Sequence, residues 1–438
     1  MRLAPVLHLF LLVTVACSSL NPVPAHRAQT LERPEAAPSA GPDEGGEASG
    51  FFELRRAAGE ARQKGDLEAA LELLTRVHRF GPQNPIVSLQ LAEVLVQTGH
   101  REEALGHLRA LVVGGVYLDL HESEALATLA GDPSFGAILE GLEANREPVA
   151  RAKIVCRFDA PGLAPEGIDL DRKRRRVVLG SFSRGQLVSA GLDCVTQELT
   201  PAGTLGVVAG IRVDAGRDLV WATSNAEEGI EGVRPAVVAV RLDSGKVVAR
   251  KELASGGAAV LLNDLEVTPD GAVYVTESIG GTLLRTCLDC PALEVFVPAG
   301  TMPGPNGVTA AGEGATLYVA HAAGISRVDS TTGAEDRLRV PEGEITVGAD
   351  GLYWHEGTLV AVQNQPFHDR IVQLILDEAG REVVETRVLN ARSPGGMFHS
   401  TGFLLDGRFY FNGVPGGLPA PAELQDQRPV LLAVPLSD

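Results

Sequence analysis

The sequence has few basic residues, few cysteines, few aromatic residues and a single long apolar run near its start. Lys and Arg number 38 against 56 Asp and Glu, which leaves a formal net charge of −18. Nucleic-acid binding needs clustered Lys and Arg to neutralise phosphates, so this balance excludes a nucleic-acid partner from our expectations. The negative charge instead fits a protein that attracts cations.

Cysteine is scarce, and its spacing excludes a zinc knuckle. Cys287 and Cys290 form a C-x-x-C pair, but no second pair or histidine lies nearby in the sequence to complete a zinc site. With Cys156 and Cys194 they make an even number, which permits disulfides in an exported chain without determining their pairing. We interpret Cys287 and Cys290 as a local disulfide or as two ordinary thiols.

The apolar run, 6–15, is too short to span a bilayer and follows Arg2. We interpret residues 1–17 as an export signal. Thr14 to Cys17 resembles the lipobox of bacterial lipoproteins, which implies acylation of Cys17. A lipoprotein of the cell envelope, facing the periplasm or in the outer membrane, is therefore expected, with the lipid as its only membrane attachment. Secretion after plain cleavage is the alternative.

The next two segments predict a tether and a helical domain. Residues 18–50 are rich in Pro, Ala, Gly and Glu and lack apolar periodicity, which predicts a disordered linker. Within 51–147, helical segments beginning at Gly65 and Gly99 lie 34 residues apart and resemble tetratricopeptide repeats. The resemblance implies a groove for a protein partner; a packed helical spacer is the alternative. We expect a separate α-domain with a cleavable linker at 146–153.

The rest of the chain, 153–438, repeats one β-hairpin pattern. Residues 262–278 read LNDLEVTPDGAVYVTES, with alternating apolar residues on either side of a Pro-Asp-Gly turn. Related segments begin at Pro165, Val208, Pro305, Ala349 and Phe398. A spacing of 43 to 49 residues between the later copies is typical of a four-stranded propeller blade. We predict an all-β six-bladed propeller, closed by pairing of 154–158 with 429–436.

Alignment of the hairpins places one residue at the start of each first strand, here called the head of the blade. The heads are Glu166, the pair Val208 and Ala209, Asn263, Asn306, Asp350 and His399. If all first strands start on one face, the heads converge on the axis. Asn263 and Asn306 would each pass for turn residues on their own.

Two carboxylates and two amides at one structural position predict an oxygen cage for a metal: Glu166, Asn263, Asn306 and Asp350. Ca²⁺ suits these ligands best, with Mn²⁺ and Zn²⁺ as alternatives. Residues just after the second strands should line the opening on the face that carries the heads, here called the mouth. They include Asn225, Ser278, His321, Asn364 and Asn412. His321 and His399 are candidate proton carriers.

The hairpins at 262–278, 305–321 and 349–364 are similar to those of the senescence-marker-protein/gluconolactonase/luciferin-regenerating-enzyme family of regucalcin-like six-bladed propellers. The resemblance implies that Glu166, Asn263, Asn306 and Asp350 bind one metal and that Asp350 is the general base. Members that act on sugar lactones tend to have an Arg shortly before the third-blade Asn. Leu261 and Leu262 stand there in this chain, which leaves room for an apolar lactone or ester.

We therefore predict a metal-dependent hydrolase of small lactones or esters, exported and tethered to a membrane. Its candidate catalytic residues are Asp350, His399 and His321. One alternative is a non-catalytic envelope module in which the metal stabilises the propeller and the helical repeats recruit a partner. Another is a propeller similar to strictosidine synthase.

Overall fold

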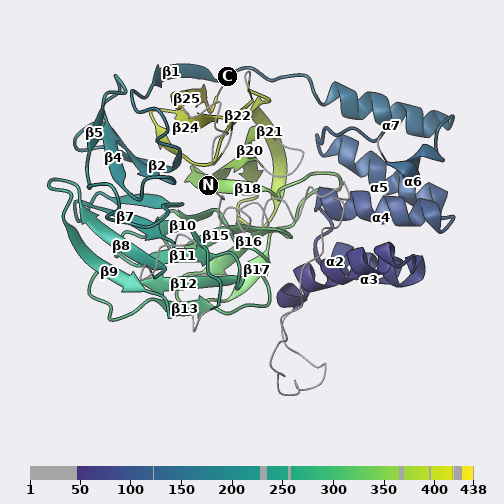
Figure 1. Cartoon of the computed structure of the whole chain (residues 1–438), viewed down its shortest axis with the longest axis horizontal. Coiled ribbons are helices and arrows are strands. Elements are labelled where there is room, and N and C mark those ends of the chain that lie inside the picture. The colour runs from purple at the N-terminus through teal and green to yellow at the C-terminus, as the bar shows by residue number, and fades with distance from the viewer. Residues whose placement is uncertain are drawn as a thin grey trace, which may run out of the picture.

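The computed structural model describes residues 47–121, 123–226, 234–254, 258–364, 369–393, 396–416, 418 and 427–437. The expected export signal, Cys17 and the linker up to residue 46 lie outside this range. The described residues form a small helical region followed by a six-bladed β-propeller, as predicted (Figure 1). The helices begin at Glu47, so the last four residues of the predicted linker are helical instead. No described helix has the length and apolar character needed to cross a membrane.

The helical region follows the predicted repeat. Its helices are α2 Glu47–Gln63, α3 Leu67–Phe80, α4 Pro85–Gln97, α5 Arg101–Val113, α6 Glu124–Ala127 and α7 Pro133–Ala144. Gly65 and Gly99 end helices with φ of 77° and 86°, a conformation that glycine adopts without strain. Helices α3 and α4 are capped by side chains: Asp66 accepts from the N–H of Ala69 at 3.1 Å, and Asn84 from that of Ile86 at 3.1 Å. The 34-residue spacing thus marks two helical hairpins.

Each of the first five blades is an antiparallel sheet whose strands follow chain order from the axis outward. The first three blades are β2 Pro165–Asp171, β3 Arg176–Ser181, β4 Leu187–Ala190 and β5 Thr196–Glu198; β6 Ile211–Asp214, β7 Leu219–Ser224, β8 Ala236–Arg241 and β9 Val247–Glu252; β10 Leu262–Val267, β11 Val273–Glu277, β12 Thr282–Thr286 and β13 Glu294–Val297. The next two are β14 Val308–Ala311, β15 Thr316–His321, β16 Gly324–Asp329 and β17 Glu335–Arg337; β18 Ala349–His355, β19 Thr358–Gln363, β20 Arg370–Leu376 and β21 Val383–Ala391.

The sixth blade joins the two ends of the propeller sequence. It contains β22 Met397–Phe398, β23 Gly402–Leu405, β24 Arg408–Pro415, β25 Val430–Pro435 and, as its outer strand, β1 Lys153–Arg157. β1 pairs antiparallel with β25, which confirms the predicted closure. A disulfide between Cys156 of β1 and Cys194 of the first blade, with Cα atoms 5.9 Å apart, ties the closing strand to the next blade. Closure completes the sixth blade, so the outer strands of the blades are the edges that remain.

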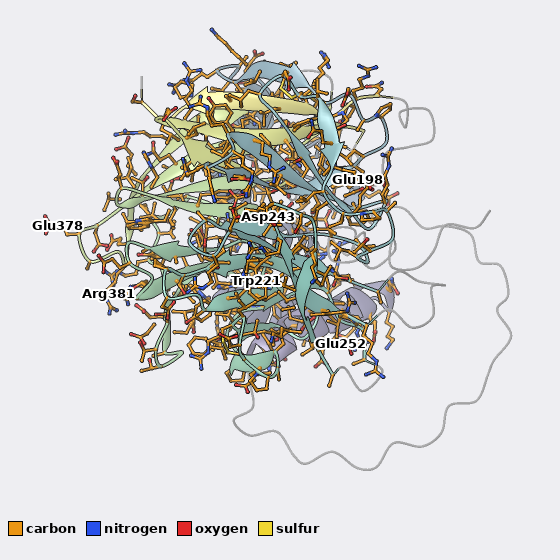
Figure 2. All side chains as sticks on the ribbon, turned by 90° about the vertical axis from the view of Figure 1, so that its left-hand side faces the viewer. Glu198, Trp221, Asp243, Glu252, Glu378 and Arg381 are labelled. Carbon is orange, nitrogen blue, oxygen red and sulfur yellow. A yellow bond between two sulfur atoms is a disulfide. The ribbon has the colours of Figure 1, made fainter. Side chains whose placement is uncertain are left out.

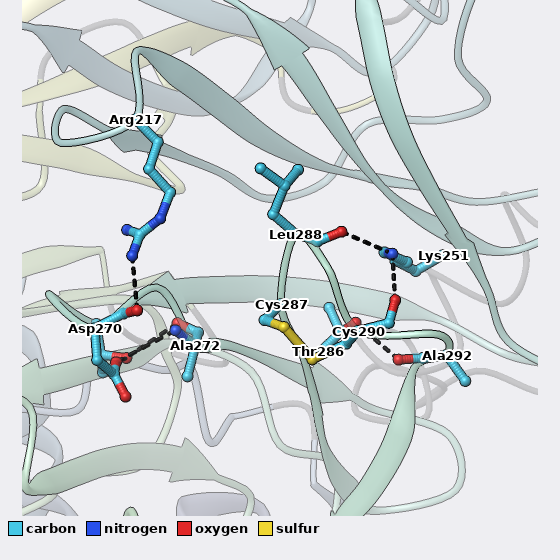
Figure 3. The surroundings of a disulfide bond; sticks show 10 residues. Arg217, Lys251, Asp270, Ala272, Thr286, Cys287, Leu288, Cys290 and Ala292 are labelled. Carbon is cyan, nitrogen blue, oxygen red and sulfur yellow. Dashed lines mark hydrogen bonds between the residues drawn. A yellow bond between two sulfur atoms is a disulfide. The ribbon is translucent and has the colours of Figure 1, made fainter.

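The C-x-x-C pair is a local disulfide. Cys287 and Cys290 are bonded, with Cα atoms 4.9 Å apart, in the turn between β12 and β13 (Figure 3). Lys251 of the neighbouring β9 donates to the carbonyl oxygens of Leu288, at 3.0 Å, and of Cys290. The turn therefore joins two blades.

The propeller packs apolar side chains between its blades and carries exposed charged residues on its outer strands. Trp221 of β7 is 1% exposed, whereas Glu198 of β5 and Glu252 of β9 project from outer strands (Figure 2). Side chains of a strand alternate between the two faces of its sheet. Neighbouring blades cover both faces of the inner strands, whereas the outer strands lie at the rim.

The helical region packs on the propeller along the fourth and fifth blades. Ile345 and Val347, which precede β18, share one apolar core with α3, α4 and α5. Arg370 at the start of β20 donates to the carbonyls of Gly114, at 3.0 Å, and Ile345, at 3.1 Å. Asn84 donates to the Ala322 carbonyl at 2.9 Å. The propeller residues in these contacts all lie at the end of the sheets where the first strands begin. The helices therefore cover one edge of that face.

The connection to the propeller is also paired. Val149 exchanges two backbone hydrogen bonds with Ala391 of β21, at 3.1 and 2.9 Å, and the Ala152 N–H donates to Asn390 Oδ1 at 3.0 Å. This differs from the expected free linker, because the apolar face of the helices is buried on the propeller. Within 146–153, the exposed residues are 146–148, Ala150 and Lys153.

Candidate functional site

The predicted heads lie at the axis, and three of them occupy irregularities in their strands. The register of the first strand against the second shifts between Pro165 and Ile168, between Leu262 and Leu265, and between Ala349 and Gly351. Glu166, Asn263 and Asp350 each fall inside one of these shifts. An extra residue in one strand bends it and changes where its side chains point, and such bulges are frequent next to functional sites.

Glycines let the first strands approach each other closely. Gly210 follows the head of the second blade, and a Cβ there would lie 2.5 Å from the Asn263 carbonyl oxygen. A Cβ on Gly307 would lie 2.7 Å from the Asp350 carbonyl oxygen. Because only glycine permits this approach, these positions hold the heads of neighbouring blades together.

The two carboxylates of the predicted cage act on each other. Glu166 is 2% exposed and Asp350 6% exposed. Burial raises the pKa of Glu166 well above its usual value, and the negative charges of Asp350 and Asp264 raise it further. Burial also raises the pKa of Asp350 to about 6, against the lowering effect of hydrogen bonds from Asn364 and Asn306. The arrangement thus concentrates negative charge that the described protein groups do not neutralise.

Several oxygens at this point lack a partner in the protein. Glu166 Oε2 and Asn306 Oδ1 are buried without a hydrogen bond. The amide nitrogen of Asn263 donates to Ser278 Oγ at 3.1 Å, so its carbonyl oxygen remains as the ligand atom. Buried polar atoms are nearly always satisfied in native proteins, so unpaired oxygens beside two carboxylates fit a bound cation.

The type of cation follows from the ligand atoms. Among the described residues, no three His, Cys, Asp or Glu side chains are grouped as metal ligands. A cation at the axis would therefore be held by amide oxygens together with Glu166 and Asp350. This ligand set is typical of Ca²⁺ and lacks the nitrogen and sulfur that Zn²⁺ prefers.

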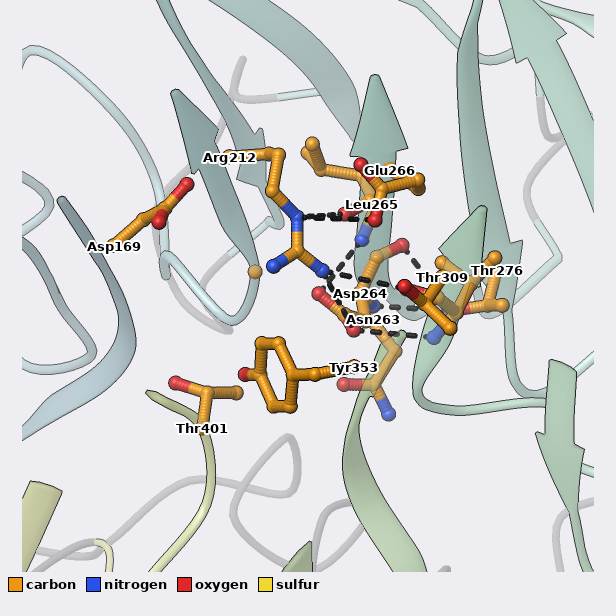
Figure 4. Close-up of polar contacts among 12 residues, drawn as sticks. Asp169, Arg212, Asn263, Asp264, Leu265, Glu266, Thr276, Thr309, Tyr353 and Thr401 are labelled. Carbon is orange, nitrogen blue, oxygen red and sulfur yellow. Dashed lines mark hydrogen bonds and ion pairs between the residues drawn. The ribbon is translucent and has the colours of Figure 1, made fainter. Parts of the chain in front are cut away.

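A second axial layer, which sequence reasoning missed, lies deeper along the first strands (Figure 4). Its centre is the buried Arg212 of β6, which lies 3.8 Å from Asp264 Oδ2 and 3.6 Å from Glu266 Oε2. Its guanidinium carbon lies 5.2 Å from the centre of the Tyr353 ring. Burial alone would lower the pKa of Arg212, but Glu266 and Asp264 raise it above its usual value. Arg212 therefore stays charged and closes the axis with an ion cluster.

A signal for this layer was present in the sequence. Five of its residues lie three positions after a head: Asp169, Arg212, Glu266, Thr309 and Tyr353. Regular strand alternation would point them away from the side that carries the heads. The register shifts in the first, third and fifth blades change that alternation. The spacing of these residues is visible in the sequence, but the register shifts are not.

Residues just after the second strands were expected to line the mouth, but several join blades. The Asn225 amide donates to the Leu262 carbonyl at 2.8 Å, and Ser278 donates to the Pro305 carbonyl at 2.6 Å. Asn412 donates to the Pro165 carbonyl at 2.7 Å across the closing seam. Each of these bonds holds the residue directly before the next head. The bonds therefore help to position the residues of the predicted cage.

The two candidate histidines occupy different settings. His399 lies beside the cage, because the Asn364 amide donates both to Asp350 Oδ2, at 2.6 Å, and to the His399 carbonyl oxygen, at 2.7 Å. His321 is bonded within its own blade, to Ser326 Oγ at 2.9 Å. Burial and then the charge of Arg337 lower its pKa well below the usual value, with no contribution from the axial carboxylates. The structure therefore joins His399, but not His321, to Asp350.

Comparison with known proteins supports the helical repeats directly. A tetratricopeptide repeat family model matches residues 61–112. No curated protein matches the chain. Among solved structures, the chain is similar to a PQQ-bound aldose sugar dehydrogenase from Streptomyces coelicolor, with 15% identity, a TM-score of 0.46, and coverage of 66% of this chain and 100% of the other.

Two further solved structures are similar at the same level. A gluconolactonase from Xanthomonas campestris is 18% identical, with a TM-score of 0.44 and coverage of 66% of this chain and 100% of the other. Virginiamycin B lyase from Staphylococcus aureus is 16% identical, with a TM-score of 0.43 and coverage of 59% and 80%. The fold assignment itself depends on the strand order described above.

Proposed function

We propose that this protein is a metal-dependent hydrolase of small lactones or esters, with a Ca²⁺ ion at the propeller axis. The observation that carries the proposal is the buried pair Glu166 and Asp350, surrounded by amide oxygens without a protein partner. Two buried carboxylates without a cation would repel each other. Mn²⁺ and Zn²⁺ are the alternatives to Ca²⁺. The resemblance of three hairpins to regucalcin-like propellers supports the same site.

In this proposal, Glu166, Asn263, Asn306 and Asp350 hold the ion. A divalent cation supplies polarisation of a substrate carbonyl or of a bound water. Asp350 accepts the proton of the attacking water, because it is one of the two buried carboxylates at the head positions. Asn364 holds Asp350 in position through its bond to Oδ2 at 2.6 Å.

The cell-envelope setting is part of the proposal. A lipid on Cys17 would anchor the protein at a membrane, and plain secretion remains the alternative. The two disulfides fit an oxidising compartment. The helical repeats would recruit a protein partner through surface that does not face the propeller.

A substrate screen tests the function. Purified protein is assayed against aliphatic and sugar lactones and aryl and alkyl esters, with Ca²⁺, Mn²⁺ and Zn²⁺ added separately. We expect metal-dependent turnover of an apolar lactone or ester that is lost in Asp350→Asn, while the variant still binds the ion in calorimetry. Metal binding without turnover of any substrate would favour the non-catalytic envelope module. Absence of metal binding by the wild type would overturn the site.

A further inference from the structure

His399 has a hydrogen-bond pattern that determines its tautomer. Its Nδ1 lies 2.7 Å from the backbone carbonyl oxygen of Asn412, which can only accept. Nδ1 must therefore carry the hydrogen. In the neutral ring Nε2 is then an acceptor, so the Ser393 hydroxyl, with Oγ 2.9 Å away, donates to it. This is the direction of hydrogen bonding that a serine nucleophile and its base require.

The surroundings of Ser393 support the same direction. The Asn390 amide donates into Ser393 Oγ at 3.0 Å, which occupies an acceptor position and leaves the hydroxyl hydrogen for His399. Burial lowers the pKa of His399, so the ring is neutral and able to accept a proton at neutral pH. The carboxylate of Asp369 has Oδ1 3.9 Å from Nε2. It is placed to stabilise the positive charge that the ring gains with a proton.

The second serine–histidine pair of the propeller has the opposite direction and serves as an internal comparison. The Ala323 N–H donates to His321 Nδ1 at 3.2 Å, so Nδ1 is the acceptor and Nε2 carries the hydrogen. His321 therefore donates to Ser326, and the Ser326 hydroxyl donates to the Glu335 carboxylate. His321 cannot take the Ser326 proton in this arrangement. Ser326 is also fully buried, whereas Ser393 is 9% exposed.

Ser393 and His399 lie beside the proposed metal site. A single side chain, Asn364, contacts both the Asp350 carboxylate and the His399 backbone. Arg392, directly before Ser393, has a φ of 53°, a conformation that an L-residue adopts only at a sharp turn. The Ser393 side chain turns back toward β21, where its Oγ accepts the hydrogen bond from Asn390. Asn364 thus connects His399, the partner of Ser393, to the Asp350 carboxylate of the proposed metal site.

We propose that Ser393 is a nucleophile that accepts an acyl group, with His399 as its base. The Ser393 oxygen attacks the ester carbonyl while its proton passes to His399 Nε2. The ester C–O bond then breaks, and the leaving alcohol takes that proton from His399. Water, deprotonated by His399, hydrolyses the acyl-serine and releases the acid and the free hydroxyl. The proposal goes beyond the metal-dependent hydrolysis proposed above: it is a separate route to the same products, and the reactivity of the serine does not depend on the cation.

An active-site-directed phosphonylation tests this role. The purified protein is treated with an alkyl fluorophosphonate, which forms an O–P bond with an activated serine and releases fluoride. Labelling is measured by peptide mass spectrometry, once in EDTA and once with Ca²⁺. We expect one adduct, on Ser393, under both conditions. The adduct should be absent in Ser393→Ala, fall at least tenfold in rate in His399→Gln, and persist in Ser326→Ala.

The wild-type result decides the proposal even if a variant does not fold. An unlabelled wild-type protein, or an adduct only on another serine, would overturn it. A folded His399→Gln protein that labels at the wild-type rate would also overturn it, because Ser393 would then not depend on its base. Labelling in EDTA separates this proposal from the metal site: Ser393 can label in a protein that binds no ion, and an ion can bind where Ser393 stays unlabelled.

Discussion

Replacement of Asp350 by Asn tests whether the buried negative charge of Asp350 lowers the stability of the fold when no cation is bound. The two side chains have the same shape. The amide oxygen can still accept the hydrogen bond from Asn364, which is 2.6 Å long in the wild type. What the variant loses is a buried negative charge. Without a cation at neutral pH, Asp350→Asn should therefore be more stable than the wild type, against the usual effect of substitutions in a protein core.

The size and sign follow from the pKa of Asp350. A rise from 3.8 to about 6 on folding corresponds to about 3 kcal/mol between the two protonation states. Because the folded state binds this proton more tightly than the unfolded state, the wild type loses stability as pH rises from about 4 to about 6, and the loss is complete above that. Asp350→Asn lacks this titration, so its gain should be near zero at pH 4 and largest at pH 7.5.

Urea denaturation in EDTA, followed by tryptophan fluorescence, measures the difference between variant and wild type at both pH values. Addition of Ca²⁺ to one hundred times its dissociation constant should stabilise the wild type by about 2.7 kcal/mol and shrink the difference. Asp243→Asn is the control, because that carboxyl is exposed and its pKa is lowered, to about 2, by its bond from Arg241. If Asp350→Asn is no more stable than the wild type at pH 7.5 in EDTA, the account of the buried charges is wrong.

Three further predictions concern other parts of the chain. Arg212→Met should destabilise the protein by about 3 to 5 kcal/mol in urea denaturation, because it leaves Asp264 and Glu266 buried without a cation; an unchanged midpoint would contradict the ion cluster. Trypsin should cut after Arg146, in the exposed 146–148 segment, yet the two fragments should co-elute in gel filtration, since the helices stay packed on Ile345 and Val347; separate elution would mean that this packing is weak. Cys17→Ser should move the protein from the membrane to the soluble fraction, and unchanged fractionation would rule out the lipid anchor.

The propeller was predictable because its evidence in the sequence is local and repeated. Each blade repeats a hairpin with turn residues between two β-branched strands, so the period identifies the fold without any knowledge of long-range contacts. The closing strand followed from the same pattern, and Lys153–Arg157 does pair with β25. The positions of Glu166, Asn263, Asn306 and Asp350 at the starts of strands came from alignment of these repeats.

The direction of side chains was not predictable in the same way. Asn225 and Asn412 were expected in the mouth, yet both donate to carbonyls of the adjoining blade. An asparagine after a strand can turn to solvent, to its own backbone or to a neighbouring blade, and only the three-dimensional packing decides among these. The packing of the helical repeats was missed for a related reason: Asn84 and Ala322 are brought together only when both regions have folded.

The position of the helical repeats bears on the metal site. The residues that contact the helices include Gly304, which precedes Asn306, and Ile345 and Val347, which precede Asp350. A Cβ on Gly304 would lie 3.1 Å from the Phe52 ring, so α2 contacts the chain two residues before a predicted ligand. A partner that moves the helices would therefore act on the two segments that present Asn306 and Asp350. The helical region is placed to influence the geometry of the cage, whereas Glu166 and Asn263 are held by the rest of the propeller.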